Sequence, residues 1–174
     1  MNKKILPFFL LLISLSVGFG QAQYEISQDT KHPDVKVLRG VINKYLIQND
    51  TAFKSWYEMN YRIYGPDSST LNAFERARGK VNFILFGGTW CDDTQFVLPR
   101  FFHLQEMTGI PDSSISFFAV NRMKQSLGNI SQAFNIKNVP TIIIMKEGKE
   151  AGRVVEYGKT GKWDKELADI LNSL

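Results

Sequence analysis

The feature that most constrains the fold is the stretch Val81–Leu98, which contains the single cysteine of the sequence. Apolar residues dominate Val81–Phe86, and such a run is typical of a strand that is buried on both faces in a parallel or mixed sheet. Gly87 and Gly88 then allow a sharp turn, after which a helix is predicted to begin at Cys91. A cysteine at a helix N-terminus faces unpaired backbone N–H groups and the positive end of the helix dipole, and both favour the thiolate. The stretch therefore predicts a reactive sulfur.

The residues that follow alternate between helix and strand patterns. A helix is predicted over Asp92–Met107, with Pro99 inside it. The further predicted elements are a strand at Ile115–Val120, a short helix at Asn129–Phe134, strands at Thr141–Met145 and Arg153–Tyr157 joined by a Lys-Glu-Gly-Lys hairpin, and a helix in Trp163–Leu174. The predicted architecture is α/β, with the order β-α-β-α-β-β-α, a central mixed sheet and helices on both faces.

Residues 23–79 are predicted to form an N-terminal helical extension that packs on this core. Tyr24–Pro33 is polar and is expected to be a loose lead-in, whereas Asp34–Gln48 places its apolar residues at helical spacing. A second helix follows, capped by Asp50 or Thr51, and a third, capped by Ser68 or Ser69. The second helix carries an aromatic stripe that either docks onto the core or lines a substrate groove, formed by Phe53, Trp56, Tyr57, Tyr61 and Tyr64.

The first 22 residues have the pattern of a secretory signal peptide. Lys3 and Lys4 precede an apolar run from Ile5 to Phe19, and small residues lead up to Ala22. The run is short for a membrane span, so cleavage is favoured over the alternative, an uncleaved anchor. We expect export to the periplasm or beyond, with no stable membrane anchor after cleavage.

Charge argues against a nucleic-acid partner. The formal net charge is +4, but removal of Lys3 and Lys4 leaves 19 basic against 17 acidic residues. No basic stripe with interleaved aromatic residues stands out in the sequence. The length suits one domain with a full core, and we expect a monomer.

Several motifs resemble the thioredoxin fold over roughly Lys80–Leu174. They are the pair Trp90-Cys91, Pro99 eight residues after the cysteine, Val139-Pro140-Thr141, the strand pair that ends at Tyr157, and the final helix. The likeness is greatest to secreted bacterial thioredoxin-like proteins with a Trp-Cys-x-Asp-(Cys/Ser/Thr) motif. The resemblance implies a cis bond before Pro140, a Val139 backbone that pairs with an extended peptide substrate, and a Trp90 side chain that flanks the sulfur.

Two positions depart from the family pattern. Thr94 stands where a thioredoxin carries its second, resolving cysteine, so no disulfide can form within this sequence. Leu85 stands where thioredoxins bury an aspartate that handles protons. Dithiol oxidoreductase activity therefore does not follow from the resemblance.

Three residues are candidates for catalysis. Cys91 is the candidate nucleophile, and the alternative is an inert structural thiol. Thr94 lies one helical turn away, where its hydroxyl either donates a hydrogen bond to the thiolate or only fills space. Asp93 is either a general acid/base or, with Asp92, a first-turn acid that stabilises the helix N-terminus while opposing the thiolate.

Neither histidine has a cysteine or acidic partner at metal-ligand spacing. His103 lies twelve residues after Cys91 on the same predicted helix, too far along it to act as a base, and His32 falls in the lead-in. We therefore expect no metal site and no other cofactor.

Two hypotheses of different classes follow. The first is an exported monothiol oxidoreductase, in which Cys91 forms a mixed disulfide with a protein or small-molecule partner and an external thiol resolves it. The second is a catalytically degenerate thioredoxin-fold module that binds peptide or protein beside Pro140. The absence of a second cysteine favours the module, whereas the position of Cys91 favours the enzyme.

Overall fold

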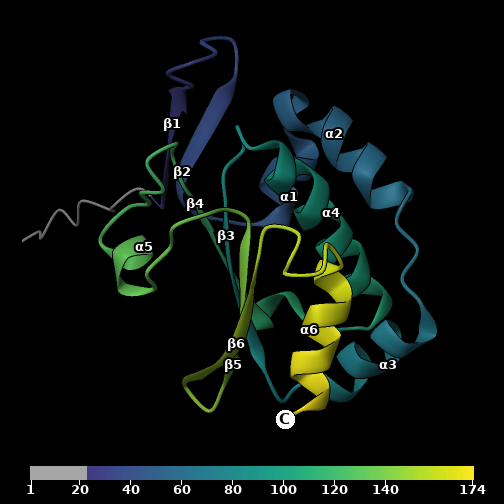
Figure 1. Ribbon diagram of the computed structural model, residues 1–174. Coiled ribbons are helices and arrows are strands. Elements are labelled where there is room, and N and C mark those ends of the chain that lie inside the picture. Colours follow the sequence, from purple (N-terminus) through teal and green to yellow (C-terminus); the bar gives the residue numbers. More distant parts are fainter. Residues whose placement is uncertain (1–22) are drawn as a thin grey trace, which may run out of the picture.

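A six-stranded mixed sheet forms the centre of the molecule, in the strand order β1-β2-β4-β3-β5-β6. The structure is a computed structural model and describes residues 23–174 (Figure 1). The strands are β1 (Tyr24–Gln28), β2 (Lys36–Ile42), β3 (Asn82–Gly87), β4 (Ile115–Ala119), β5 (Thr141–Lys146) and β6 (Lys149–Val155). The helices are α1 (Lys44–Asn49), α2 (Thr51–Arg62), α3 (Ser68–Ala77), α4 (Asp92–Met107), α5 (Ile130–Ala133) and α6 (Trp163–Asn172), with a 3-10 turn at Asp112–Ser114.

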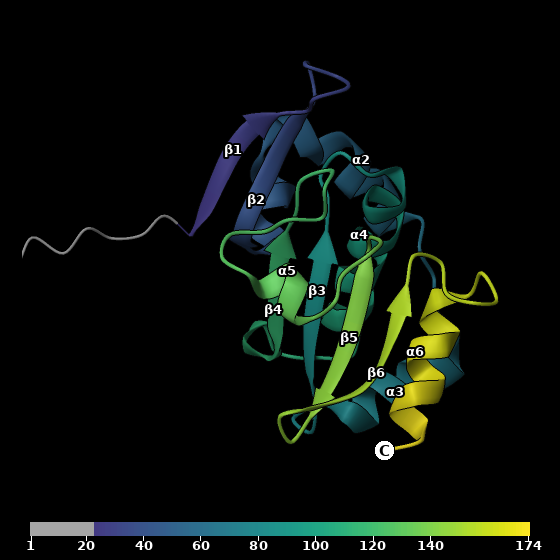
Figure 2. The ribbon, with the colours of Figure 1, turned by 60° about the vertical axis from the view of Figure 1, so that its left-hand side comes forward.

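The strand directions are those of a thioredoxin fold. β3 runs parallel to β4 and antiparallel to β5, and β5 is antiparallel to β6. From β3 onward the elements follow the predicted order β-α-β-α-β-β-α. Figure 1 shows the sheet nearly edge-on, with α5 on one side and the other helices on the opposite side, and Figure 2 shows α5 in front of the strands. The predicted fold class, with helices on both faces, is confirmed.

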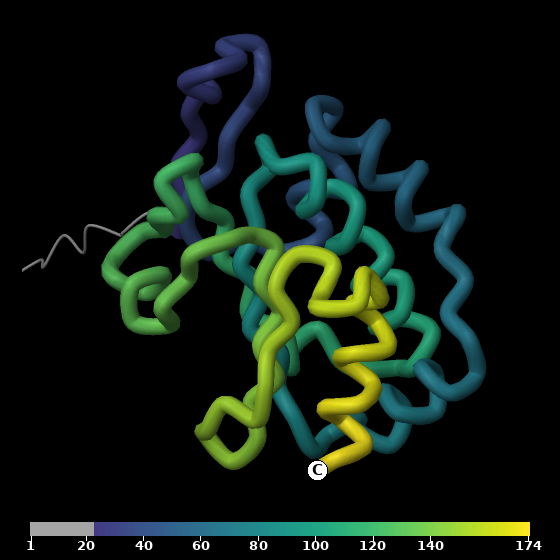
Figure 3. The backbone as a smooth tube through the Cα atoms, viewed as in Figure 1, coloured from purple at the N-terminus to yellow at the C-terminus, as the bar shows by residue number. Residues whose placement is uncertain are grey.

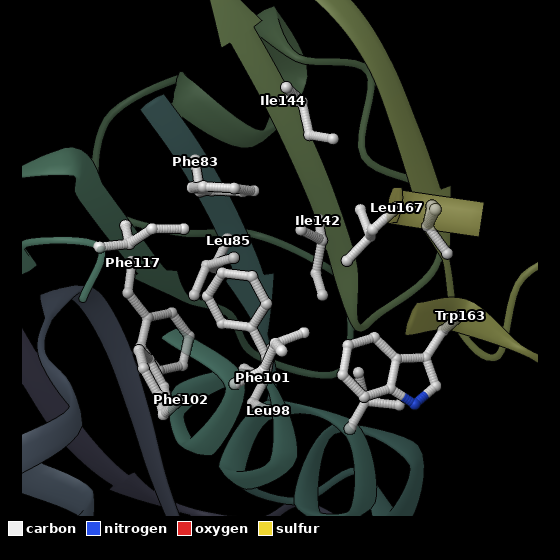
Figure 4. Close-up of a cluster of buried hydrophobic side chains, with 14 of the residues drawn as sticks. Phe83, Leu85, Leu98, Phe101, Phe102, Phe117, Ile142, Ile144, Trp163 and Leu167 are labelled. Carbon is white, nitrogen blue, oxygen red and sulfur yellow. The ribbon is translucent and has the colours of Figure 1, made fainter. Parts of the chain in front are cut away.

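Alternate residues of β3 supply the cores on the two faces of the sheet. Phe83 and Leu85 are fully buried in the larger cluster, between the sheet and α4 and α6 (Figure 4). Phe86 belongs to the smaller cluster on the α5 face, against which Ile84 packs. In the larger cluster the rings of Phe83 and Phe101 meet edge to face at 5.3 Å between centroids. This alternation is the period of two expected of a strand that is covered on both faces.

The prediction for residues 24–48 was wrong in its secondary structure. The expected lead-in contains strand β1, and the expected helix is strand β2 followed by the short α1, which begins only at Lys44. β2 pairs antiparallel with β1 on one side and with β4 on the other. Its β-branched Val37 and Ile42 are buried on the sheet, and this long-range pairing overrides the helical spacing seen in the sequence. The extension is therefore mixed α/β, not helical.

The remainder of the extension is helical as predicted, and its aromatic stripe packs onto the core. Phe53 and Tyr57 are buried in the larger cluster, and Trp56, Tyr61 and Tyr64 pack against it. Asp50 caps α2, as one of the two expected residues, whereas α3 is capped by Asp67 in place of Ser68 or Ser69. A domain boundary near residue 80 stays a prediction.

The signal peptide predicted at residues 1–22 lies outside the described residues. Within residues 23–174, no helix combines the length and the apolar character needed to cross a bilayer.

The Phe101→Ala variant tests how far stability rests on the contact between α4 and β3. Phe101 has no exposed surface, so its truncation should lower the free energy of unfolding by about 3–5 kcal/mol. Urea titration of the purified protein measures the change. Met59→Ala is the matched control, because Met59 is 57% exposed and its loss should change stability by less than about 0.5 kcal/mol. Equal losses in the two variants would contradict the prediction.

Candidate functional site

Cys91 stands at the start of α4, directly beyond the end of β3. It is the N-cap residue, with an extended backbone (φ −105°, ψ 121°), and its N–H donates to the Gly88 carbonyl at 2.9 Å. The Cys91 carbonyl accepts from the N–H of Gln95 at 3.0 Å, the first bond of the helix. The thiol is half-buried. The chain path in Figure 3 places this turn at the same end of the molecule as the loop between β1 and β2 and the loop that follows β4.

The structure brings Cys91 together with the segment predicted to face it. The Cys91 Sγ donates to the Val139 carbonyl oxygen at 3.3 Å, and the peptide bond between Val139 and Pro140 is cis. Val139 and Pro140 are both buried and lie immediately before β5. The sulfur therefore lies against the main chain of the residue that precedes the proline. Because the S–H is the donor, this hydrogen bond needs the proton of the thiol.

Trp90 is held firmly beside the cysteine. Its indole Nε1 donates to the Val120 carbonyl at 2.8 Å, across the loop after β4. A Cβ added to Gly88 would lie 2.5 Å from that nitrogen, so only glycine leaves room for the indole. Two cations lie over the ring, the Arg122 guanidinium at 4.7 Å and the Lys124 ammonium at 5.5 Å from ring centres.

Thr94 points into the protein. Its side chain is 2% exposed, and its hydroxyl oxygen accepts from the Gly88 N–H at 3.2 Å. A Cβ on Gly87 would lie 2.8 Å from the Thr94 methyl, which shows how closely the helix approaches the turn. No hydrogen bond joins Thr94 to Cys91 among those of residues 23–174. Thr94 thus fixes the shape of the turn that carries the cysteine.

Asp93 has a partner that the sequence analysis did not single out. Burial, followed by a hydrogen bond with Asp93, raises the pKa of Tyr157 to about 12. The phenol therefore stays protonated at neutral pH. Asp92, the other first-turn acid, is exposed. Since Cys91 also contributes to the Tyr157 shift, cysteine, aspartate and tyrosine share one electrostatic environment.

The loop between β1 and β2 forms a wall beside the site. The Thr89 hydroxyl donates to the Lys36 carbonyl at 3.0 Å and accepts from the Leu38 N–H at 3.2 Å, which ties the cysteine turn to β2. Asp29 directly follows β1, and its fully buried carboxylate accepts two contacts from the Arg122 Nε, at 2.7 and 2.9 Å. The wall is therefore fastened both to the cysteine turn and to the loop after β4.

An open cleft of about 440 Å³ lies between this wall and the start of α4. Cys91 and Trp90 line it together with charged and polar neighbours. The lining consists of His32, Val35, Trp90, Cys91, Asp92, Asp93, Gln95 and Arg122. The α4 side of the cleft is negative, because Asp92 and Asp93 lie there, and the side formed by the loop after β4 is positive, because Arg122 lies there. Its size suits a small molecule or a few residues of a peptide.

The two histidines take different places. His103 stacks on Tyr61 at 4.3 Å between ring centroids, and its Nδ1 lies 2.7 Å from the Tyr61 carbonyl oxygen, in the contact between α4 and α2. His32, which the sequence analysis left without a role, lines the cleft. No group of three or more His, Cys, Asp or Glu side chains in residues 23–174 converges as a metal site.

Sequence reasoning missed Asp29, Arg122 and Tyr157. Asp29 and Arg122 are 93 residues apart and meet only because β1–β2 folds beside β4. Tyr157 lies two residues after the end of β6, and its proximity to Asp93 depends on how α4 crosses the sheet. None of the three has a local sequence signal for this role.

Together, the strand order, the cysteine at the start of the first core helix and the cis-proline segment facing it define a thioredoxin-class protein. Comparison with known proteins agrees. Over 96 residues, the chain is 31% identical to Thioredoxin-like protein R548 of Acanthamoeba polyphaga mimivirus, covering 53% of this chain and 67% of the viral protein. It is 30% identical over 96 residues to Thioredoxin H9 of Arabidopsis thaliana, covering 55% of this chain and 64% of the plant protein. The chain belongs to the thioredoxin-like family.

The matched region thus spans slightly less than two thirds of the plant relative. Among solved structures, a protein of unknown function from Pseudomonas aeruginosa superposes with a TM-score of 0.53 at 15% identity, over 76% of this chain and 90% of that one. An HIV epitope-scaffold superposes with a TM-score of 0.54 at 15% identity, over 76% of this chain and 91% of that one. These two show the fold alone. No protein-family model matches the chain.

The Gly88→Ala variant should displace Trp90. The new methyl would overlap the indole, so the ring must leave its place and lose the hydrogen bond to Val120. We expect a shift in tryptophan fluorescence and a loss of about 1–2 kcal/mol in the free energy of unfolding. Gly65→Ala is the control, because nothing lies within 4 Å of its added Cβ. An unchanged emission spectrum in Gly88→Ala would contradict the placement of Trp90.

Docking of the hairpin should depend on pH through Asp29. Burial alone would raise the pKa of Asp29, but hydrogen bonds from Arg122, Lys31 and His32 outweigh it and hold the pKa below its usual range. A carboxyl with a depressed pKa stabilises the fold above its unfolded value of about 3.9, and that contribution is lost as the pH falls through the folded value. Asp29→Asn should therefore be less stable than the wild type at pH 7, with the gap narrowing below about pH 4. Urea titrations from pH 7 to pH 3 measure the gap; a gap independent of pH would contradict the prediction.

Proposed function

We propose that this chain is an exported thioredoxin-like protein that carries out thiol–disulfide exchange through Cys91 alone. One observation carries the proposal. Cys91 lies at the start of α4 and lines the cleft, and its half-buried sulfur contacts the Val139 carbonyl. The similarity to a plant thioredoxin and to a viral thioredoxin-like protein supports redox chemistry of this general kind. The signal-like pattern of residues 1–22 supports export to the periplasm or beyond.

The exchange proceeds in two displacements. The Cys91 thiolate attacks one sulfur of a disulfide; a new sulfur–sulfur bond forms, and the other sulfur leaves as a thiolate that takes a proton from water. An external thiolate then attacks the mixed disulfide and releases Cys91 as a thiolate. The external thiol is a small molecule or a partner protein, because the sequence holds no second cysteine. Each displacement exchanges one disulfide for another, so the electrons balance without a further oxidant.

The surrounding residues have separate parts in this scheme. Ionisation of Cys91 breaks its bond to the Val139 carbonyl and leaves that oxygen able to accept an N–H from an extended partner chain bound beside Pro140. Asp93, which lines the same cleft as Cys91, is the group that takes the thiol proton. Thr94 keeps the turn in shape through Gly88. Trp90 covers one side of the sulfur.

The second candidate is a binding module of the same fold in which the redox chemistry is lost. A specific observation favours it: Leu85, fully buried in the larger cluster, fills the position where a thioredoxin would carry its buried acid. The Cys91 thiol would keep its hydrogen bond to the Val139 carbonyl. In this alternative, the cleft and the main chain beside Pro140 hold a partner without a covalent step.

Replacement of Cys91 by serine tests the leading proposal. The assay measures release of reduced peptide from a peptide–glutathione mixed disulfide, with excess reduced glutathione as the external thiol. Because the displacement needs the sulfur, Cys91→Ser should retain less than about 1% of the wild-type rate above background. Thr160→Ser, an exposed residue far along the chain from the cleft, is the control and should keep the full rate. Wild-type turnover in Cys91→Ser would exclude the mechanism.

The alkylation rate of Cys91 between pH 7 and pH 9 separates the two candidates. A free cysteine, with a pKa of about 8.5, would accelerate roughly 25-fold over this range, because the thiolate is the nucleophile. An activated thiolate should accelerate less than about fivefold. The binding module would be established by two results together. The thiol would react only after the protein unfolds, and the Cys91→Ala variant would still bind its partner.

A further inference from the structure

Arg122 is fixed beside the cleft from two sides. Its Nε donates to both oxygens of the fully buried Asp29 carboxylate, and its guanidinium lies over the Trp90 ring at 4.7 Å. The Asp29 carboxylate is itself held by the N–H groups of Lys31 and His32, at 2.7 and 2.9 Å. A side chain with this many constraints loses little freedom when it binds a further group.

The terminal nitrogens of Arg122 have no protein partner among the hydrogen bonds of residues 23–174, where only its Nε is engaged. Arg122 lines the cleft that holds Cys91, whereas Asp29 is not among the residues of that cleft. Asp29 therefore holds the guanidinium through Nε alone and leaves both terminal nitrogens without a protein hydrogen bond within the described residues. A planar guanidinium with its two terminal nitrogens available matches the geometry of a carboxylate, which it binds through two parallel hydrogen bonds.

The charges around the cleft give such a carboxylate one place to bind. On the Trp90 side, Lys124 lies over the same ring at 5.5 Å and adds a second cation. On the α4 side, Asp92 and Asp93 line the cleft and repel an anion. A carboxylate in the cleft is thus directed away from the start of α4 and toward Arg122.

We propose that Arg122 forms a carboxylate-binding subsite in the cleft beside Trp90, and that the disulfides preferred by Cys91 carry an acidic group near the sulfur. This inference rests on the proposed exchange at Cys91. The carboxylate belongs either to a small disulfide or to an acidic side chain next to the cysteine of a protein. The chemistry recognised is the same in both cases.

A matched pair of small disulfides tests the subsite. Dithiodipropionate carries a carboxylate at each end, and its diamide has the same shape without charge. The wild type should form a mixed disulfide with the dicarboxylate roughly tenfold faster than with the diamide, and Arg122→Gln should reduce the ratio to near one. Arg122→Lys should lose most of the preference, because an ammonium lacks the fork. Equal ratios in the wild type and Arg122→Gln would overturn the proposal.

Two further variants separate the subsite from general effects. Lys124→Gln removes a positive charge from above the same ring and should change the ratio of the two rates by less than about twofold. A loss as large as that of Arg122→Gln would mean that the overall positive potential, and not a specific contact, gives the preference, and it would overturn the proposal. Arg122→Gln leaves the Asp29 carboxylate buried without its cation. The double variant Asp29→Asn/Arg122→Gln removes both charges together and should also lose the preference.

A second pair of substrates identifies the source of the carboxylate. Two peptides, each carrying an uncharged methyl disulfide on its cysteine, differ only by Asp or Asn beside that cysteine. Preference for the Asp peptide that depends on Arg122 supports an acidic protein side chain. Preference confined to the small dicarboxylate supports a small disulfide. Absence of any preference in both pairs would overturn the proposal.

Binding to the unreactive variant separates this inference from the proposed exchange. Dithiodipropionate is titrated into Cys91→Ser while the indole N–H signal of Trp90 is followed by NMR. The signal should shift in Cys91→Ser and stay unchanged in Cys91→Ser/Arg122→Gln. If Cys91 in the wild type reacts with neither disulfide, the proposed exchange is wrong. The titration still tests the subsite in that case: a shift of the Trp90 signal supports it, and the absence of a shift overturns it.

Discussion

The burial of β3 on both faces is the constraint on which the remainder of the structure depends. Phe83 and Leu85 fill one side of the sheet while Phe86 fills the other, so the strand cannot slide by one residue without exposing both sets. The register of β3 then sets where the chain emerges from the sheet. Because α4 packs on the same aromatic cluster through Phe101, the distance between strand and helix is fixed, and the turn between them has one shape. The packing of β3 and α4 therefore fixes the position of Cys91 at the end of that turn.

The residues after Val81 could be predicted well because their signals are local. A continuous apolar run, paired glycines and a first-turn acid each mark an element within a few residues, and the limits of α4 match the prediction at both ends. The β1–β2 hairpin could not be predicted in the same way, because its strand character comes from pairing with β4 more than seventy residues away. The sequence spacing of its apolar residues fits a helix as well as a strand.

The candidate site divides along the same line. Cys91, Val139 and Pro140 were found from motifs, and the structure places all three together. The side chains that shape the cleft around them come from the loops, where the fold leaves the sequence free to vary. Arg122 and Asp29 belong to this group. Their meeting depends on the hairpin, and so it could not be recognised before the hairpin itself was known.

The Thr89 hydroxyl links the cysteine turn to the N-terminal hairpin. Its two bonds to β2 make a strand outside the minimal thioredoxin core a structural partner of the cysteine turn. A chain shortened to residues 80–174 would leave β4 as an edge strand with unpaired main-chain groups, the kind of surface that promotes aggregation. It would also leave the Thr89 hydroxyl without its strand. The hairpin therefore covers the edge of β4 and holds the cysteine turn at the same time, so removal of residues 23–79 would disturb both.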